Sequence, residues 1–524
     1  MLILQKYIYY LIILCNFYIK NNRNRYFIAF IQYLGGKMKK FNKKEIIKII
    51  LILIACFAIF SQYYLEHYVT DAYKQAYLGT SYLTQLKLIE GRPIQSLYFF
   101  ILNKIGINLS TLKEYLLIYR INLTLSIILI SFAILITNQI ILKIINTNNK
   151  KYKLLILLII STFFINLSIN EYLLFIENYI MILGIILTIF SSLVFIKSSK
   201  KSKYAISLIL LLIASFCYQG TITIFMPFTH LLCLLSKDKN STKNLLKIVI
   251  IYGIILILNF LVIRYFYNIL PKYDNRLQEN INLINNVLEI LYTIFINFTF
   301  LSCVTFFIVV MSNIKILNIK NILIILVLVL ITITSYTCFR FGNAAVLTNR
   351  LILSLHWLLG IIYLYVIFLH KNISNKKYMI LYLCFVIYLL LSIIALIYFQ
   401  RLHINSTKKN QQVIYQIINT IDNYETLTGI KIDKVAFYSD KYPNSSKYYN
   451  CIGNELDVYT YPLLYYNWSD IYCINILGKR HLKKANTSEL DHKIYDYFKE
   501  NDWDDLNLEE QIIFNDNVIN ICIF

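Results

Sequence analysis

Apolar segments long enough to cross a lipid bilayer recur through the first four hundred residues of this 524-residue chain. A membrane-spanning helix needs about 20 apolar residues, because it must traverse a hydrocarbon layer ~30 Å thick. We therefore predict an all-α polytopic membrane protein with about 11 transmembrane helices. The predicted spans lie near 46–64, 115–141, 154–170, 178–196, 204–217, 221–235, 248–268, 288–311, 321–338, 349–369 and 378–399.

The loops between these segments predict the orientation of the chain. Basic loops such as KKFNKK, KSSKKSK and HKNISNKK alternate along the chain with loops of the other class. Lys and Arg gather on the cytoplasmic side of membrane proteins. We therefore expect a multi-pass protein of the cell (inner) membrane, with a cytoplasmic N-terminus and an extracytoplasmic C-terminal domain.

Three regions are expected along the chain. Residues 1–37 precede Met38, whose basic and then apolar sequence is typical of the start of a bacterial membrane protein. We expect residues 1–37 to be an upstream mis-start or, alternatively, an extra membrane-associated hairpin. Residues 38–400 are the predicted multi-span region. Residues 401–524 are expected to form a small soluble α/β domain, with helices in 411–429 and 491–506 and strands in 434–440, 456–461 and 517–524.

The net charge of +23 is unevenly distributed. Residues 1–400 contain 38 Lys and Arg against 11 Asp and Glu, whereas the remaining residues contain 13 against 17. The basic excess therefore belongs to the membrane region, where it sets orientation, and nucleic acid is not an expected partner. The ten cysteines show no C-x-x-C pair, and the sequence predicts no metal site.

Carboxylates gather on the predicted outer face. Of the eleven Asp and Glu residues between 38 and 400, nine lie at outer positions. Acidic residues contribute little to the orientation rule, so their placement needs another explanation. They are either solvated loop ends or part of an active site at the outer face, and both interpretations stay open. The nine residues are Glu66, Asp71, Glu90, Glu114, Glu171, Glu177, Asp274, Glu279 and Glu289.

The longest outer segment within the membrane region contains two polar motifs. In TDAYKQAYLG, Asp71 and Lys74 fall on neighbouring positions of a short helix that we expect to lie along the membrane surface. In EGRPIQSLYFFILN, Glu90 precedes a glycine, Arg92 and a proline. The glycine permits a turn, and proline is favoured at the first position of a helix. Arg92 would therefore stand beside free backbone N–H groups, where it could bind an anion.

Two further features lie at predicted span ends. Tyr218 and Gln219 interrupt the apolar stretch between the short segments 204–217 and 221–235, which we expect to cross and return. The alternative is one long helix kinked at the following glycine. Arg340 and Arg350 flank another outer loop, where they either snorkel to the interface or bind a lipid phosphate.

These motifs together resemble the Gtr type II glucosyltransferases. The pieces that carry the resemblance are TDAYKQAYLG, EGRPIQSLYFFILN, SFCYQGTITIF and, more loosely, NRLILSLHWLLG and NDNVINICIF. The resemblance implies a multi-span glycosyltransferase (a hexosyltransferase) that acts outside the cytoplasmic membrane. Its donor would be a polyprenyl-phosphate sugar, with glucose as the sugar. Its acceptor would be a cell-surface polysaccharide such as the O-antigen of lipopolysaccharide.

The same resemblance implies roles for individual residues. Asp71 would be the catalytic carboxylate, and Lys74 would stand in the family's basic position. The family often shows two adjacent acids here, whereas this chain has Thr70 before Asp71. No cofactor is therefore certain, and a divalent cation stays open. The expected substrate-binding residues are Lys74, Glu90, Arg92, Tyr218, Gln219, Arg340 and Arg350.

A different class of protein remains as the alternative. A transporter or flippase of a lipid-linked glycan would line its path with similar acids and arginines. The chain contains no Gly-rich phosphate loop and no G-x-S-x-G nucleophile motif, which disfavours a nucleotide-driven pump and a serine hydrolase.

Overall fold

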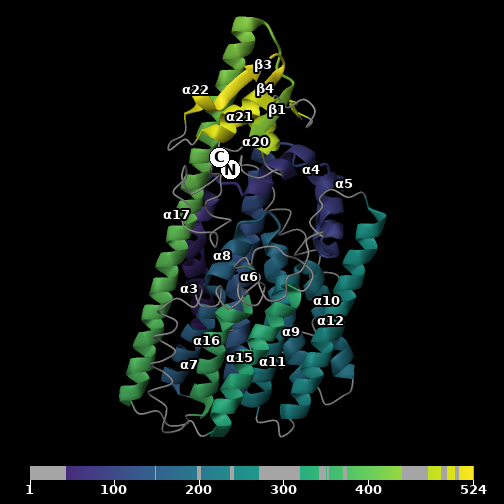
Figure 1. Ribbon diagram of the computed structural model, residues 1–524. Helices are drawn as coiled ribbons and strands as arrows, with labels where there is room; N and C mark the ends of the chain where they lie inside the picture. Colours follow the sequence, from purple (N-terminus) through teal and green to yellow (C-terminus); the bar gives the residue numbers. More distant parts are fainter. Residues whose placement is uncertain are drawn as a thin grey trace. The chain divides into compact units, whose positions relative to one another are not determined.

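The computed structural model describes residues 43–147, 149–197, 202–236, 241–270, 319–340, 350, 353–369, 375–438, 470–485, 492–501 and 507–522. The chain divides into two compact units after Ile54, and the contacts described below belong to the second unit. The described residues are mostly helical, with a small sheet near the C-terminus (Figure 1).

Within the described residues, five helical segments are long and apolar enough to cross a membrane. They are Ile47–Tyr64, Leu112–Ile145, Asn178–Ile196, Lys243–Ile269 and Tyr378–Thr428. They belong to α3 (Lys43–Phe60) with η1 (Ser61–Tyr64), α6 (Leu112–Ile145), α9 (Asn178–Lys197), α12 (Ser241–Ile269) and α17 (Asn375–Thr428).

Shorter apolar helices occupy most of the other predicted spans. They are α10 (Ser202–Cys217), η2 (Gln219–Ile224) with α11 (Phe225–Leu235), α15 (Ile319–Arg340) and α16 (Leu353–Leu369). The predicted segment 154–170 is a pair, α7 (Lys150–Phe164) and α8 (Leu167–Leu173), bent by 50° between the two helices. Ten of the eleven predicted segments thus coincide with helices, and segment 288–311 lies outside the described residues.

The short helices α10 and α11 both pack against α9 and run in opposite directions. Ser207 of α10 is hydrogen-bonded to Ser191 of α9 at 2.8 Å, and Cys217 lies beside Gly184. The chain then runs back along α9, as a hydrogen bond shows: Thr229 of α11 donates to Ser192 Oγ at 2.8 Å. The alternative of one long helix kinked at the glycine is therefore wrong, and residues 218–220 form the turn between two antiparallel helices.

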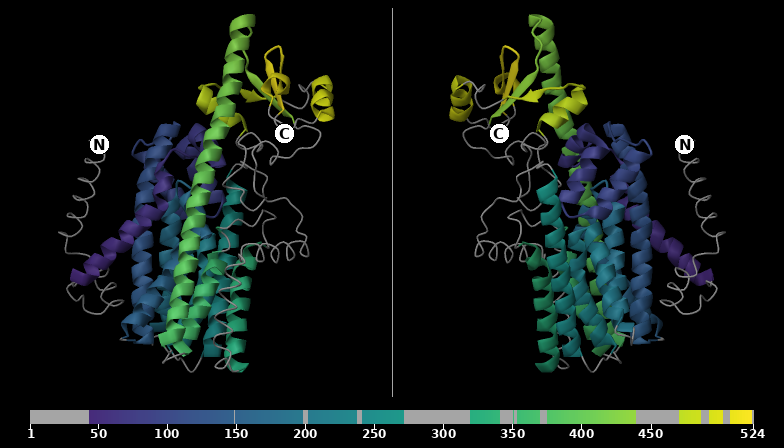
Figure 2. Two further views of the ribbon diagram at one scale, coloured as in Figure 1. Left: turned by 90° about the vertical axis from the view of Figure 1, so that its left-hand side faces the viewer. Right: turned by 90° about the vertical axis from the view of Figure 1, so that its right-hand side faces the viewer.

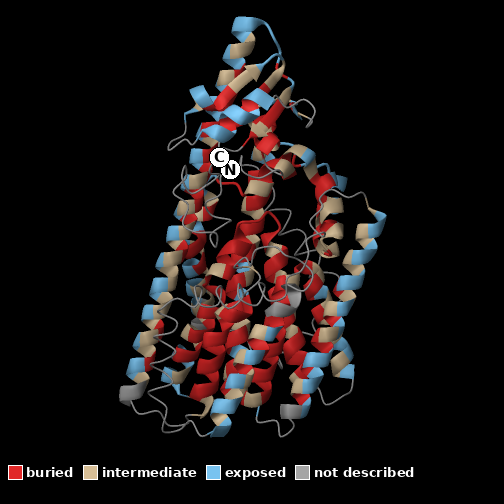
Figure 3. Ribbon diagram, viewed as in Figure 1, coloured by how far each residue is buried: buried red, intermediate tan, exposed pale blue. Residues whose placement is uncertain are grey.

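Burial separates two kinds of helix. The side chains of α9, α11 and α16 are buried on nearly every face, whereas α12 and α17 expose many apolar side chains (Figure 3). An apolar helix that is buried all round belongs in a core, and exposed apolar faces suit contact with lipid. This pattern is compatible with location in a membrane.

The last long helix differs from its prediction. The helix expected at 411–429 is not separate, because α17 continues for 54 residues through the boundary placed at residue 400. No Gly or Pro interrupts the sequence from Asn375 to Thr428. The helix ends where Gly429 adopts a φ of +73°, a conformation that glycine takes readily after a helix.

The C-terminal sheet has four strands in the order β2-β1-β4-β3. Strand β1 (Lys434–Tyr438) pairs in parallel with β2 (Lys483–Lys484) and β4 (Val518–Cys522), and β3 (Ile512–Asn515) is antiparallel to β4. Figure 2 shows this sheet beside the C-terminal end of α17.

Three helices accompany the sheet: α20 (Asp470–Gly478), α21 (His492–Glu500) and α22 (Leu508–Gln511). Among the described residues, β1 and β4 confirm the strands predicted at 434–440 and 517–524, and α21, which ends at Glu500, confirms the helix predicted at 491–506 in part. The predicted strand at 456–461 lies outside the described residues. The sequence did not lead us to expect α20 or β3. Cys473 and Cys522 are buried.

Candidate functional site

A tight turn joins α4 (Thr70–Ile89) to α5 (Pro93–Lys104). Gly91 adopts a φ of +71°, and the N–H of Arg92 donates to the carbonyl of Lys87 at 2.8 Å. A Cβ atom on Gly91 would lie 2.3 Å from Cγ1 of Ile263 on α12. A side chain here would be strained in backbone conformation and would also collide with its neighbour. The predicted turn and the helix after it are confirmed.

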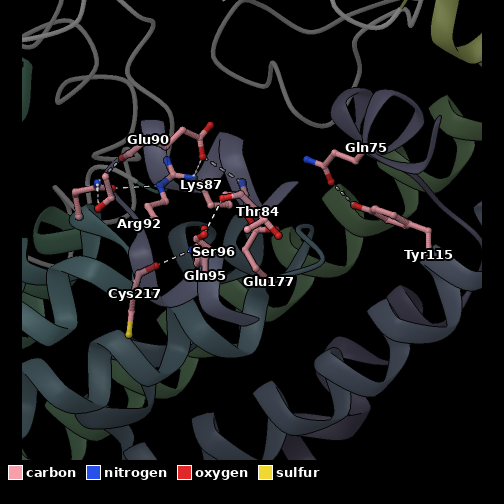
Figure 4. Close-up of polar contacts among 12 residues, drawn as sticks. Gln75, Thr84, Lys87, Glu90, Arg92, Gln95, Ser96, Tyr115, Glu177 and Cys217 are labelled. Atoms are coloured by element: carbon pink, nitrogen blue, oxygen red, sulfur yellow. Dashed lines mark hydrogen bonds and ion pairs between the residues drawn. The ribbon is translucent and has the colours of Figure 1, made fainter. Parts of the chain in front are cut away.

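Arg92 lies at the centre of the predicted motifs. Its Nε donates to Gln219 Oε1 at 3.2 Å, and its Nη1 donates to Glu90 Oε2 at 2.9 Å. Its guanidinium carbon lies 4.7 Å from the centre of the Tyr218 ring. Figure 4 shows Arg92 and Glu90 among the polar contacts of this region. Four residues singled out in the sequence therefore come into direct contact.

Gln219 connects the turn between α10 and α11 to the turn after α4 through hydrogen bonds. Its Nε2 donates to the carbonyls of Glu90 and Gly91, at 2.7 and 3.1 Å. Gln95 on α5 is buried and donates to the carbonyl of Cys217 at 2.7 Å. This bond satisfies a carbonyl at the C-terminal end of α10, which has no partner within its own helix.

Arg350 approaches the same turn from another part of the chain. Its backbone N–H donates to Glu171 Oε2 at 3.0 Å, and its Nε lies 3.4 Å from Glu171 Oε1. The hydroxyl of Tyr172 donates to the carbonyl of Arg350 at 2.8 Å, and the Tyr172 ring packs edge-on against Tyr218 at 5.3 Å. Arg92 and Arg350 therefore both lie next to Tyr218.

Asp71 lies in the first turn of α4 and is half-buried. Within the part of the chain that the structure describes, its carboxylate makes no hydrogen bond or ion pair. It lies in the electrostatic field of Arg350. The same guanidinium also interacts electrostatically with Tyr218, Glu171 and Glu90. One turn further along α4, Gln75 accepts a hydrogen bond from Tyr115 at 3.2 Å.

The Lys74 side chain points away from the turn where Arg92 and Arg350 lie. Its ammonium lies 5.6 Å from the ring centres of both Tyr82 and Tyr472. Tyr472 belongs to α20, and nearby Tyr77 is hydrogen-bonded to His481 at 3.1 Å. Lys74 thus faces the C-terminal domain. Arg340 is the last residue of α15, and its side chain lies outside the described structure.

A buried ion pair beside Arg92 was missed in the sequence. Nζ of Lys87 lies 2.6 Å from Glu177 Oε1 and 3.2 Å from Glu90 Oε2. The Lys87 and Glu177 side chains are only 5% and 0% exposed. Burial would lower the pKa of Lys87, but Glu177 and Glu90 raise it. The signal was the charged pair at positions 87 and 90, next to a turn between apolar segments.

The carboxylates that the sequence predicts on the outer face lie in different environments. Glu66 and Glu114 are exposed, as the solvated-loop interpretation requires. That interpretation is wrong for Glu171 and Glu177, which are fully buried. The other acids predicted on that face, at 274, 279 and 289, lie outside the described residues. Among the described residues, no three His, Cys, Asp or Glu side chains form a group that could hold a metal ion.

Among the described residues, Arg92 and Arg350 thus lie beside Tyr218, and the Asp71 carboxylate, which makes no hydrogen bond or ion pair there, interacts electrostatically with Arg350. No protein-family model, no curated protein and no solved structure matches this chain.

Proposed function

We propose that this chain is a glycosyltransferase of the Gtr type II kind. It would move a sugar, glucose by resemblance, from a polyprenyl-phosphate donor to a cell-surface glycan such as O-antigen. In this proposal the chain crosses the cell membrane eleven times, with its N-terminus in the cytoplasm and its C-terminal domain outside. The site around Tyr218 then lies toward the outer face, where the phosphate of a lipid-linked donor is accessible.

The observation that carries the proposal is the donor capacity of the two arginines. Within the described structure, Arg92 uses only Nε and Nη1 for hydrogen bonds, and Arg350 uses only Nε in its ion pair. Their other N–H groups make no hydrogen bond to any residue that the structure describes. Both side chains are partly exposed, at 20% and 26%. Planar guanidinium groups suit the oxygens of a phosphate, to which they can donate two hydrogen bonds.

Asp71 supplies the complementary chemistry. The acceptor hydroxyl forms a bond from its oxygen to the anomeric carbon of the sugar, while the bond from that carbon to the phosphate oxygen breaks. The hydroxyl proton passes to the Asp71 carboxylate, which needs to be unpaired for this role. General-base help of this kind contributes about 10²- to 10⁴-fold to a rate. The leaving polyprenyl phosphate gains negative charge, which Arg92 and Arg350 stabilise.

A transfer assay with purified protein tests the proposal. The protein in detergent is given polyprenyl-phosphate glucose, labelled in the sugar, together with isolated O-antigen. We expect label in the glycan and an equal amount of released polyprenyl phosphate. The flippase alternative makes a different prediction, since labelled donor would cross the bilayer of proteoliposomes with no release of polyprenyl phosphate. Transport without release would overturn the glycosyltransferase proposal.

A further inference from the structure

Lys87 and Glu177 join α4 to the start of α9 inside the protein. Their side chains are almost completely buried, and the charged atoms lie 2.6 Å apart. Glu177 immediately precedes α9, so its charge also lies close to the positive end of that helix dipole. Neither residue has a part in the proposed proton transfer.

Stability alone is a poor explanation for such a pair. Removing two charges from water costs several kcal/mol per ion, and apolar replacement of a buried pair is often neutral or stabilising. A buried pair is better explained when it holds a third group in place. Here the third group is Glu90, whose Oε2 atom contacts both Lys87 at 3.2 Å and Arg92 at 2.9 Å.

The contacts form one chain of alternating charge, from Glu177 through Lys87 and Glu90 to Arg92 (Figure 4). Each contact in this series restricts the position of the next side chain. Without Glu177, the Lys87 ammonium would draw the Glu90 carboxylate away from Arg92. Without Lys87, Glu90 would be free to take two hydrogen bonds from Arg92 and would occupy the N–H groups that a phosphate needs.

We propose that Lys87 and Glu177 are positioning residues. They set the orientation of the Arg92 guanidinium and determine which of its N–H groups can bind a lipid phosphate. This inference rests on the proposed function, because it takes Arg92 as a phosphate ligand. It assigns a role to a buried pair that touches neither the donor nor the acceptor.

A charge-free double variant, Lys87→Met with Glu177→Gln, tests the proposal. The dissociation constant for polyprenyl monophosphate is measured in detergent, together with the melting temperature. We expect a melting temperature close to that of the wild type, because neither charge is left unpaired. We expect the dissociation constant to rise about tenfold, the equivalent of one lost charge-assisted hydrogen bond. Lys247→Met, which removes an exposed lysine on α12, is the control and should change neither quantity.

A charge-reversed variant, Lys87→Glu with Glu177→Lys, provides the second measurement. It keeps a buried ion pair but places a carboxylate against Glu90, so we expect a folded protein with weakened phosphate binding. Wild-type affinity in either folded variant would overturn the positioning role. Failure of both variants to fold would also overturn it, because the pair would then be structural.

The outcome is separable from that of the proposed function. Absence of sugar transfer by the wild-type protein contradicts the proposed function, whatever the two variants bind. Normal transfer by the wild type, combined with unchanged phosphate affinity in the variants, contradicts only the positioning role.

Discussion

Arg92 and Gln219 stand 127 positions apart in the sequence, and a hydrogen bond of 3.2 Å joins Nε of the first to Oε1 of the second. The amide nitrogen of Gln219 also binds the carbonyls of Glu90 and Gly91. The turn after α4 and the turn after α10 are therefore joined by hydrogen bonds in both directions. The position of the guanidinium therefore depends on both turns.

Arg92→Lys should weaken phosphate binding while the protein stays folded. Lysine keeps the positive charge but lacks the planar fork that bonds Gln219, Glu90 and a ligand at the same time. We expect the dissociation constant for polyprenyl monophosphate to rise about tenfold. Lys74→Met is the comparison, because Lys74 faces the C-terminal domain. Its effect on this constant should stay within about twofold, and a larger effect than that of Arg92→Lys would contradict the assigned geometry.

Gly220→Ala should destabilise the turn that carries Tyr218. The added Cβ would lie 2.7 Å from Cε1 of Tyr218 and 3.0 Å from the carbonyl oxygen of Arg350. Overpacking of this kind costs about 1–3 kcal/mol. Gly253→Ala on α12 is the matched control, since a Cβ there meets no atom within 4 Å. Melting temperatures in detergent should fall for the first variant and hold or rise for the second. Equal melting temperatures would show that the turn tolerates a side chain.

His67 should make the protein less stable in mild acid. Its imidazole is buried among the rings of Tyr63, Tyr119 and His403. Burial, aided by the charge of Arg120, lowers the pKa of His67 from 6.5 to about 4. The folded chain thus binds fewer protons than the unfolded chain between these values. The free energy of unfolding should fall as the pH drops from 6.5 toward 4, by up to about 1.4 kcal/mol per pH unit.

The variant His67→Phe measures this contribution, because phenylalanine keeps the ring contacts and cannot be protonated. Thermal unfolding at several pH values should show a shallower loss of stability below pH 6.5 than in the wild type. His492→Gln, at an exposed position on α21, should keep the wild-type slope. The same slope in all three proteins would mean that His67 does not titrate over this range.

The positions of the helices could be predicted from the sequence because apolar length determines them directly. The long helix α17 was predicted as two pieces, since its hydropathy falls after residue 400 while its backbone continues. Hydropathy indicates whether a helix lies in apolar or aqueous surroundings. The absence of Gly and Pro indicates that the helical backbone continues without a break. The second signal was present in the sequence and was the better guide here.

The candidate site could be predicted only in part. Arg92 was selected because it stands at a predicted helix start, and Gln219 because it interrupts an apolar stretch, but no local pattern shows that residues so far apart will meet. The burial of Glu171 and Glu177 could not be predicted, because a position at a span end does not say which other segments pack over it. Lys74 was grouped with the phosphate-binding cations because the resemblance puts it in the family's basic position. Its direction depends on α20, which belongs to a distant part of the sequence.

The central claim is that Asp71 accepts the proton of the acceptor hydroxyl, and the variant Asp71→Asn tests it most directly. The transfer rate from polyprenyl-phosphate glucose is compared with that of the wild type and of Glu66→Gln, which changes an exposed acid shortly before α4. Asp71→Asn should lower the rate about 100-fold or more, while the affinity for polyprenyl monophosphate and the melting temperature stay unchanged. Glu66→Gln should transfer sugar at the wild-type rate. A folded Asp71→Asn protein that transfers sugar as fast as the wild type would contradict the account.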